Sequence, residues 1–226
     1  MKNDARLANP SVRLRSDRKV QPPIGGAIKR GFDVVGAVAG IVLLSPLFVM
    51  LAILVKFSDG GRVFYGHRRI GRNGHVFHCL KFRTMVENGD QVLADHFAKN
   101  PQSRDEWLAT RKLQNDPRVT RVGAVLRKLS LDELPQIFNI LRGDMSIVGP
   151  RPVVKDELEL YGSASDFYLK SRPGLTGLWQ VSGRNDVSYN ARVAFDRQYV
   201  ENWSFGSDLK IIIRTVPAVF SSRGSY

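Results

Sequence analysis

SLDELPQIFNILRG, residues 130–143, is the segment from which the rest of the chain is best interpreted. Ser130 and Glu133 have the spacing of a capping box, which predicts that a helix begins at Ser130. The apolar residues that follow fall on one face of that helix: Leu131, Leu134, Phe138 and Leu141. Arg142-Gly143 suits the end of the helix. Asp132 therefore lies with Glu133 in the first turn, where the positive end of the helix dipole favours ionised carboxylates.

The residues around this acid pair suggest chemistry rather than stability alone. Acidic residues in a first helical turn are usually only stabilising. Here Arg127 and Lys128 precede the pair, and Pro150-Arg151-Pro152 follows the helix. Two acids framed by cations are typical of a site for an anion and a divalent ion. An ionised Asp132 could bind a metal or attack phosphorus.

Composition restricts the partners and the compartment. The chain has 226 residues and a net charge of +13, which favours polyanionic partners: nucleic acid, an anionic membrane surface or phosphorylated substrates. Its single cysteine, Cys79, excludes an internal disulfide and fits a reducing compartment. We expect Cys79 to be a small buried apolar residue. Residues 1–27 form a basic, proline- and glycine-broken flexible arm that either contacts anionic lipid or is simply solvated.

The apolar segment from Val34 to Val55 contains no charged residue. A straight helix of this length would cross a bilayer. Ser45-Pro46 lies at its centre, and proline removes one helical hydrogen bond, so a kink is expected. Both flanks are basic, which by the positive-inside rule favours two cytoplasmic ends. From these residues alone, a straight span and a re-entrant hairpin over residues 28–57 are equal alternatives.

The following segment, from residue 58 to residue 226, is expected to form a cytoplasmic domain. Strands are predicted at Val63-Phe64-Tyr65 and at residues 76–82, joined by a turn at Arg72-Asn73-Gly74. On the second strand, Lys81 shares a face with Arg83, which is either a phosphate grip or a solvated surface.

Helical spacing recurs in the rest of the chain. Residues 88–114 favour short helices broken at Asn100-Pro101, and their place on the membrane or over the site is left open. Further helices are expected at residues 119–129, 153–161, 193–199 and 209–220, the last with one apolar face. Arg172 to Arg184 is a glycine-rich run containing Trp179, which could bring backbone amides and guanidinium groups close to phosphates.

Four motifs follow the Ser-Pro segment in order: Lys81-Phe82-Arg83-Thr84-Met85, Leu131-Asp132-Glu133-Leu134-Pro135-Gln136, Gly149-Pro150-Arg151-Pro152 and Arg172-Pro173-Gly174-Leu175-Thr176-Gly177. In these motifs the chain resembles the bacterial sugar transferases, the monotopic phosphoglycosyl transferases that move a phosphosugar onto a polyprenyl phosphate. The resemblance covers residues from about 27 to 226. The short form looks like the galactose-phosphate transferases that start exopolysaccharide repeat units.

The resemblance implies a fold and a mechanism. The expected fold is α+β: a small sheet with surrounding helices, a re-entrant membrane helix broken at Ser45 and Pro46, and interfacial amphipathic helices. It implies that Asp132 attacks the sugar-proximal phosphorus of a UDP-sugar, that UMP leaves, and that a polyprenyl phosphate then takes the phosphosugar. Glu133 matches the second acid of the dyad, and Mg²⁺ is expected at Asp132.

The resemblance also implies further site residues and a location. Lys81, Arg83, Arg151 and Arg184 are candidate phosphate contacts, and Asp196 matches an acidic position of the family. The expected location is the cytoplasmic face of the bacterial inner membrane.

The expected partners are a UDP-sugar, undecaprenyl phosphate and membrane lipids, with no nucleic acid, and a homodimer is left open. Nothing in the sequence separates galactose from glucose. Two rivals are a basic nucleic-acid-binding protein, which leaves the uncharged segment unexplained, and a membrane scaffold without catalysis.

Overall fold

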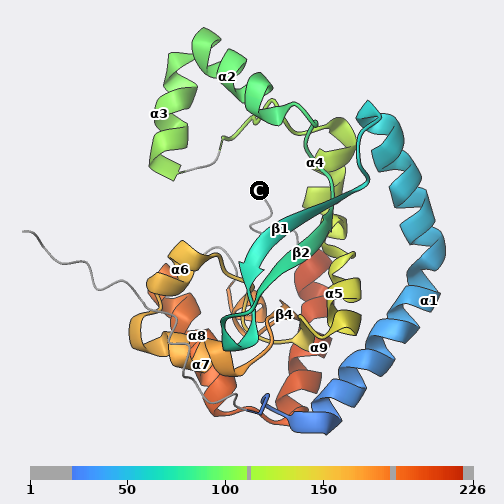
Figure 1. Cartoon of the computed structure of the whole chain (residues 1–226), viewed down its shortest axis with the longest axis vertical. Coiled ribbons are helices and arrows are strands. Elements are labelled where there is room, and N and C mark those ends of the chain that lie inside the picture. The colour runs from blue at the N-terminus through green and yellow to red at the C-terminus, as the bar shows by residue number, and fades with distance from the viewer. Residues whose placement is uncertain (1–21, 111–112, 184–186, 221–226) are drawn as a thin grey trace, which may run out of the picture.

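Small sheets at the centre of the molecule are surrounded by helices (Figure 1). The computed structural model describes residues 22–110, 113–183 and 187–220. Most of the predicted flexible arm, and the candidate residue Arg184, lie outside these ranges. Within the described residues there are two two-stranded sheets, so the prediction of a mixed fold with a small sheet is confirmed.

The first sheet is an antiparallel ribbon. Strand β1 (Phe64–Ile70) pairs with β2 (Val76–Phe82) from Phe64↔Phe82 to Ile70↔Val76, and the short helix η1 (Arg72–Gly74) joins them. The second strand has the predicted bounds, whereas the first continues well beyond the predicted Val63-Phe64-Tyr65. The second half of β1 is mostly polar, and it is a strand because its backbone pairs with β2 along the full length of both strands. A pattern of apolar residues does not reveal such pairing.

The second sheet was not predicted, and it joins two of the sequence motifs. Strand β3 (Ser146–Val148) runs parallel to β4 (Gly174–Thr176). The Gly149 amide donates to the Thr176 carbonyl at 2.9 Å, and the Gly174 amide donates to the Pro150 carbonyl at 2.8 Å. A Cβ on Gly174 would overlap the backbone of Gly149, so only glycine permits this approach. The Gly-Pro-Arg-Pro motif is therefore held by the Arg-Pro-Gly-Leu-Thr-Gly motif.

Helix α1 (Gly26–Asp59) runs along the outside of the molecule and bends near its middle (Figure 1). The structure corrects the predicted helix-break-helix, since α1 continues through Ser45-Pro46. Proline cannot donate to the Val42 carbonyl, and the Ser45 hydroxyl donates to that carbonyl instead, at 2.9 Å. The kink expected at Ser45-Pro46 is thus a bend in a continuous helix, and only the expected break is wrong.

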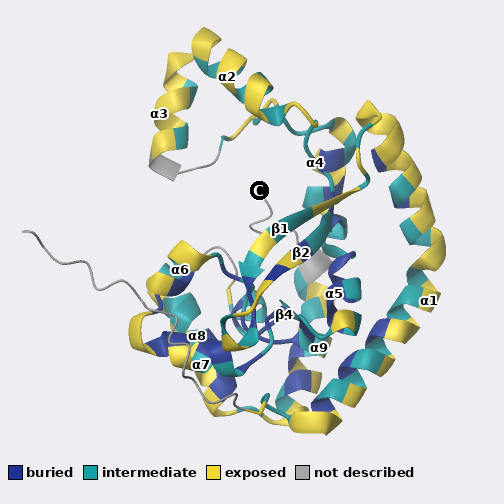
Figure 2. Cartoon of the chain, viewed as in Figure 1, coloured by how far each residue is buried: buried dark blue, intermediate teal, exposed yellow. Residues whose placement is uncertain are grey.

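One side of α1 contacts the rest of the chain, and the other is exposed and apolar (Figure 2). Ala37 packs against α5 (Gln136–Arg142), while Leu51 and Val55 pack against Phe82 and Leu126. Only 11% of the most apolar stretch of α1 is buried, which is unlike the core helix of a soluble protein. The exposed residues on the other side include Val35, Val42, Leu43, Val49, Ile53 and Phe57. These features suit association with a membrane.

Buried polar contacts attach the first turns of α1 to the rest of the molecule. The Lys29 ammonium donates to the carboxylate of Asp208 on α9 (Phe205–Phe220) at 2.6 Å. The Asp33 carboxylate accepts from the Ser146 hydroxyl and from the Ile147 amide, each at 2.9 Å. An unpaired buried charge is energetically costly, so the contacts of Lys29 and Asp33 fix the position of the first turns of α1 relative to the rest of the molecule.

Shorter helices complete the structure: α2 (Gly89–Lys99), α3 (Pro101–Thr110), α4 (Arg121–Lys128), α6 (Lys155–Glu159), α7 (Ser165–Lys170) and α8 (Tyr189–Glu201). The predicted break at Asn100-Pro101 separates α2 from α3, and these two helices project away from the sheets (Figure 1). The predicted helix before Asp132 is α4. The helix expected at residues 193–199 begins earlier, because Ser188 caps α8 by accepting from the Ala191 amide.

Candidate active site

The acid pair lies in a turn, not in the first turn of a capped helix. Asp132 and Glu133 belong to the short 3₁₀ helix η2 (Leu131–Glu133), and α5 begins only at Gln136. The predicted capping box is wrong: Ser130 has φ 56° and makes no side-chain cap hydrogen bond. An N-cap residue has extended backbone, which this left-handed conformation excludes. The predicted end of α5 is confirmed, with Gly143 at φ 90°.

Lys81 from β2 binds both acids. Its ammonium nitrogen donates to Asp132 Oδ2 at 3.2 Å and to Glu133 Oε1 at 2.7 Å. The side chain of Asp132 is 11% exposed and that of Glu133 is 42% exposed, so the first carboxylate is largely enclosed while the second borders solvent. A lysine on a strand and two acids on a distant turn are thus assembled into one charged cluster.

The electrostatics of the cluster distinguish its members. Burial raises the pKa of Asp132, and Glu133 adds to this effect, while the Lys81 ammonium opposes it. Burial opposes the charged form of Lys81 as well, but the Glu133 and Asp132 carboxylates outweigh it, so the pKa of Lys81 is raised. The lysine therefore stays protonated and favours the ionised form of the carboxylates that it binds.

Two further residues support this cluster. Arg127, at the end of α4, lowers the pKa of Asp132 through its charge, and its Nε donates to Thr84 Oγ1 at 2.9 Å. The Thr84 carbonyl in turn accepts from the Thr120 amide at 3.0 Å. The Lys-Phe-Arg-Thr-Met motif thus contributes Lys81 to the acids and Thr84 to the arginine beside them.

Asn139 is a supporting residue that the sequence analysis missed. Its side chain is fully buried in α5; its oxygen accepts from the Leu80 amide at 2.9 Å, and its nitrogen donates to the His78 carbonyl at 2.8 Å. These bonds attach β2 to α5 on both sides of Cys79. Asn139 is one of two amide side chains in α5, the other being Gln136. An amide between the apolar residues of this helix was the available signal, because a buried polar side chain needs partners.

Arg83 lies apart from the acid pair. Its guanidinium pairs with Asp59, at the end of α1. Its Nε and Nη1 are buried, with no hydrogen-bond partner among the described residues. Arg83 was expected to lie on the same face of the strand as Lys81. Because β2 ends at Phe82, the alternation of side chains between the two faces does not extend to Arg83.

Arg151 and Asp196 meet in a second cluster. The Asp196 carboxylate accepts from the Tyr161 hydroxyl at 2.7 Å and also from the Arg151 backbone amide. Asp196 is only 3% exposed, and burial raises its pKa to about 7. Its carboxylate thus faces the protein and supports the backbone of Arg151. The Arg151 guanidinium lies over the indole of Trp179, 5.5 Å from the ring centroid.

The β1–β2 ribbon connects the two clusters. Tyr65 pairs with Lys81, and His67 pairs with Cys79, so these side chains share one face. Burial lowers the pKa of His67, and the charges of Arg69 and Lys81 add to this effect. Arg69, on the same face, pairs with Glu157 of α6 at 3.2 Å. On this face the β1 side chains are polar from Tyr65, opposite Lys81, to Arg69, which reaches α6. The predicted burial of Cys79 is confirmed.

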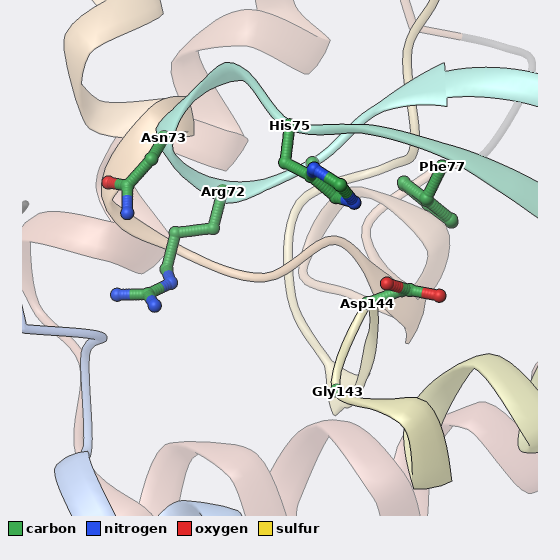
Figure 3. A pocket seen from close by; sticks show the side chains of 7 residues that line it. Arg72, Asn73, His75, Phe77, Gly143 and Asp144 are labelled. Atoms are coloured by element: carbon green, nitrogen blue, oxygen red, sulfur yellow. The ribbon is translucent and has the colours of Figure 1, made fainter.

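A separate hollow lies at the opposite end of the ribbon (Figure 3). It has a volume of about 220 Å³ and lies between the η1 turn, with Arg72, and the loop after α5, with Asp144. Phe77 lines this hollow, and Lys81 is four residues further along β2, a distance of roughly 13 Å in an extended strand. The hollow therefore does not contain the acid pair.

The candidate metal site has few protein ligands. Among residues 22–110, 113–183 and 187–220, no three His, Cys, Asp or Glu side chains gather to hold a metal ion. Mg²⁺ commonly takes one or two carboxylates and completes its shell with water and substrate phosphate. Asp132, with Glu133 beside it, fits such a site if phosphate oxygens supply the remaining ligands.

Comparisons with known proteins agree with the motifs. The family model for bacterial sugar transferases matches residues 24–222. An exopolysaccharide production protein, ExoY, of Rhizobium meliloti is 66% identical over 226 residues, which is 100% of both chains. A UDP-galactose-lipid carrier transferase of Erwinia amylovora is 53% identical over 199 residues, covering 88% of this chain and 42% of its own.

A third relative gives the same picture. The undecaprenyl-phosphate galactose phosphotransferase of Salmonella typhimurium is 52% identical over 199 residues, again 88% of this chain and 42% of its own. The chain thus spans less than half of the two longer relatives and the full length of the Rhizobium protein. It belongs to the bacterial sugar transferase family and is a phosphoglycosyl transferase, as its four motifs predicted.

Proposed function

We propose that the chain transfers a hexose 1-phosphate, with galactose 1-phosphate the expected group, from a UDP-sugar to undecaprenyl phosphate. UMP is released, and the reaction is the first membrane step of exopolysaccharide synthesis. The names of the relatives support the donor, the lipid acceptor and the pathway. The observation that carries the proposal is the largely enclosed Asp132 carboxylate, held with Glu133 by the Lys81 ammonium.

The proposed chemistry has two displacements at one phosphorus atom. A carboxylate oxygen of Asp132 attacks the sugar-proximal phosphorus, and the bond from that phosphorus to the bridging oxygen breaks. UMP leaves with that oxygen and its electron pair, and Asp132 carries the phosphosugar. An oxygen of the polyprenyl phosphate then attacks the same phosphorus and displaces the carboxylate. Splitting the transfer in this way allows two bulky substrates to use one site in turn.

The neighbouring residues have separate roles in this proposal. Lys81 orients Asp132 before the attack and balances part of the negative charge near the phosphates. Glu133, which is more exposed, accepts the proton from a monoprotonated lipid phosphate. Mg²⁺ held by Asp132 would supply positive charge to the phosphoryl oxygens.

We also propose that α1 enters and leaves the membrane on the cytoplasmic face of the inner membrane. Lys29 and Asp33 near its first turns contact the same folded body as Leu51 and Val55 near its end. In a straight span these two ends would be separated by about 30 Å of hydrocarbon, and one body could not contact both. The exposed apolar side of α1, lying between these contacts, would face lipid.

Accessibility labelling tests this topology. Single cysteines near residues 28 and 60 are placed in a Cys79→Ser background. Both should react with a membrane-impermeant thiol reagent in inverted vesicles, which expose the cytoplasmic face, and both should be protected in spheroplasts, which expose the periplasmic face. Pro46→Leu should restore the hydrogen bond to Val42 and shift the segment towards a straight span. In the protein that keeps Pro46, labelling of either cysteine exclusively from the periplasmic side would contradict the re-entrant arrangement.

The catalytic proposal is tested without the lipid. Purified protein in detergent, given Mg²⁺ and a panel of UDP-sugars, should release UMP and gain the mass of one phosphosugar on the peptide that contains Asp132. Glu133→Gln should retain part of this half-reaction and lose most of the second displacement. If UMP appears only when undecaprenyl phosphate is present, and no adduct forms at any time, the covalent mechanism is refuted. The UDP-sugar that gives the fastest burst identifies the sugar.

A further inference from the structure

Trp179 of the short helix η4 (Trp179–Val181) lies against two arginines from distant parts of the chain. The Arg151 guanidinium is 5.5 Å from the indole centroid, and the Arg192 guanidinium is 5.0 Å from it. Two positive charges thus gather at one ring. A ring quadrupole attracts each cation, but mutual repulsion of the two guanidinium groups remains unless an anion joins them.

The neighbouring acids do not supply that anion. Asp196 binds the Tyr161 hydroxyl and the Arg151 backbone, and it is only 3% exposed. Glu157 pairs with Arg69 at 3.2 Å and accepts from the Val154 amide at 3.0 Å. Among the described residues, no ion pair to a carboxylate is formed by either arginine over Trp179.

Buried donors at this position lack acceptors. The Trp179 Nε1 group and the Arg192 Nε group are both buried, and neither has a hydrogen-bond partner within the described part of the chain. Trp179 is only 7% exposed, so its indole N–H is far from bulk water. Buried donors are normally paired, so each of these groups is available to donate to a bound molecule. A molecule that presents acceptor oxygens would pair with both donors.

Helix α8 directs Arg192 towards this cluster. Arg192 follows Tyr189 by three residues and precedes Asp196 by four, so the three side chains share one helical face. Tyr189 packs against the cluster that contains Tyr161, and its hydroxyl donates to the Glu157 carbonyl at 2.8 Å. The position of Arg192 is therefore set by the same inward face that places Asp196 beneath Arg151.

We propose that Arg192 is a second phosphate-binding cation, which acts with Arg151 and the Trp179 indole N–H to hold phosphate oxygens. The inference rests on the proposed function, since that reaction supplies the phosphates. Two guanidinium groups and an indole offer only donors and positive charge, and phosphate oxygens complement both. The phosphate belongs either to the diphosphate of the UDP-sugar or to the head of the polyprenyl phosphate, and these sources can be separated by experiment.

Binding of the nucleotide tests the first source without any turnover. UDP is titrated calorimetrically into the full-length wild-type protein and into Arg192→Gln, Arg192→Lys and Trp179→Phe. The matched control is Arg197→Gln, on the same helix, whose guanidinium lies over Phe167 and pairs with Glu201. If the donor diphosphate is held, Arg192→Gln should weaken UDP binding about 10- to 100-fold, as expected for loss of a charge-assisted contact. Arg192→Lys should recover only part of the affinity, because lysine lacks the planar fork.

The lipid tests the second source. If the lipid phosphate is held instead, Arg192→Gln should leave UDP binding unchanged and raise the KM for undecaprenyl phosphate by about tenfold. Melting temperatures of all variants accompany both measurements, so a purely structural role would appear as lost stability with unchanged ligand affinities.

The proposal is overturned if Arg192→Gln and Arg197→Gln behave alike with both ligands. The titration measures the affinity for UDP and does not depend on turnover. It therefore tests this proposal even if the wild-type protein does not release UMP and the proposed function is wrong.

Discussion

Asp132 and Asp196 are both buried aspartates whose pKa is raised by burial, yet their surroundings differ in kind. Asp132 binds the ammonium of Lys81, has Arg127 nearby and lies beside the second acid, Glu133. Asp196 accepts from the neutral Tyr161 hydroxyl and from a backbone amide, and among the described residues no side-chain cation forms an ion pair with it.

The difference teaches how to separate a reacting carboxylate from a supporting one. A cation at hydrogen-bond distance favours the ionised form that nucleophilic attack requires, while neutral donors in a buried site compensate a carboxyl group only partly. Burial or a raised pKa alone would have selected both residues. We therefore assign chemistry to Asp132 and positioning of Arg151 to Asp196, and the following predictions test that contrast.

The largest effect is expected at Asp132. Asp132→Asn should lower transfer by at least about 10⁴-fold, because an amide cannot form the aspartyl phosphosugar. Asp132→Glu should fail nearly as completely, since one added methylene moves the attacking oxygen by about 1 Å. UMP release without lipid and intact-protein mass spectrometry measure both variants. Asp105→Asn on α3, exposed at the surface, is the control. Adduct formation by Asp132→Asn would reverse the assignment.

The next largest effect is expected at Lys81. Lys81→Met removes the ammonium that binds both acids, and the turnover at saturating UDP-sugar should fall about 10²- to 10³-fold, a typical loss for one charge-stabilising group. Lys155→Met, an exposed lysine of α6, serves as the control in the same steady-state assay. A change confined to KM would instead mean that Lys81 binds substrate without preparing Asp132.

The sequence predicted the location of these residues better than their contacts. The bounds of β2 and the helix before Asp132 followed from local apolar periodicity, which survives in the folded chain. The motif resemblance brought Lys81 and Asp132 into one list of candidates, and the structure brings them together. Arg83 lies in the same motif as Lys81, but its side chain pairs with Asp59 because β2 ends at Phe82.

Other features depended on partners that are distant in the sequence. The β3–β4 pair has only three residues in each strand and forms through glycines that permit close backbone approach, so neither strand shows a pattern of its own. Ser130 looked like a helix cap, but the chain turns at residues 129–130 between α4 and η2, and Ser130 adopts left-handed backbone there. The pairing of Tyr161 with Asp196 likewise has no local signature.

A smaller effect on activity is expected at Asp196, together with a change in the pH dependence of stability. Its pKa of about 7 in the folded protein lies above the ordinary value of 3.8. The folded state therefore binds more protons between these values, and stability falls as the pH rises through this window, by at most about 1.4 kcal/mol per pH unit from this group. Asp196→Asn should flatten this decline and reduce transfer by less than about tenfold, since it only supports Arg151.

Melting temperatures from pH 4.5 to pH 7.5 measure this effect, with Asp105→Asn as the control. A wild-type curve that rises across the window, or an Asp196→Asn curve that keeps the full wild-type decline, would contradict the supporting role. A loss of activity as large as that of Asp132→Asn would make Asp196 a reacting group.

The smallest effect is expected at Tyr161. Tyr161→Phe removes the hydroxyl that donates to Asp196 at 2.7 Å and leaves the Arg151 amide as the remaining donor. The hydrogen bond from Tyr161 stabilises the ionised carboxylate of Asp196. Without it the pKa of Asp196 should rise further, and the decline in stability should extend to higher pH. The variant should lose about 1 kcal/mol of stability while transfer changes by no more than about twofold. Denaturant unfolding at pH 6 and pH 8 checks both the loss and its pH dependence. An equal loss at both pH values would mean that the hydroxyl acts on packing alone, and the contrast between the two aspartates would then rest on Lys81.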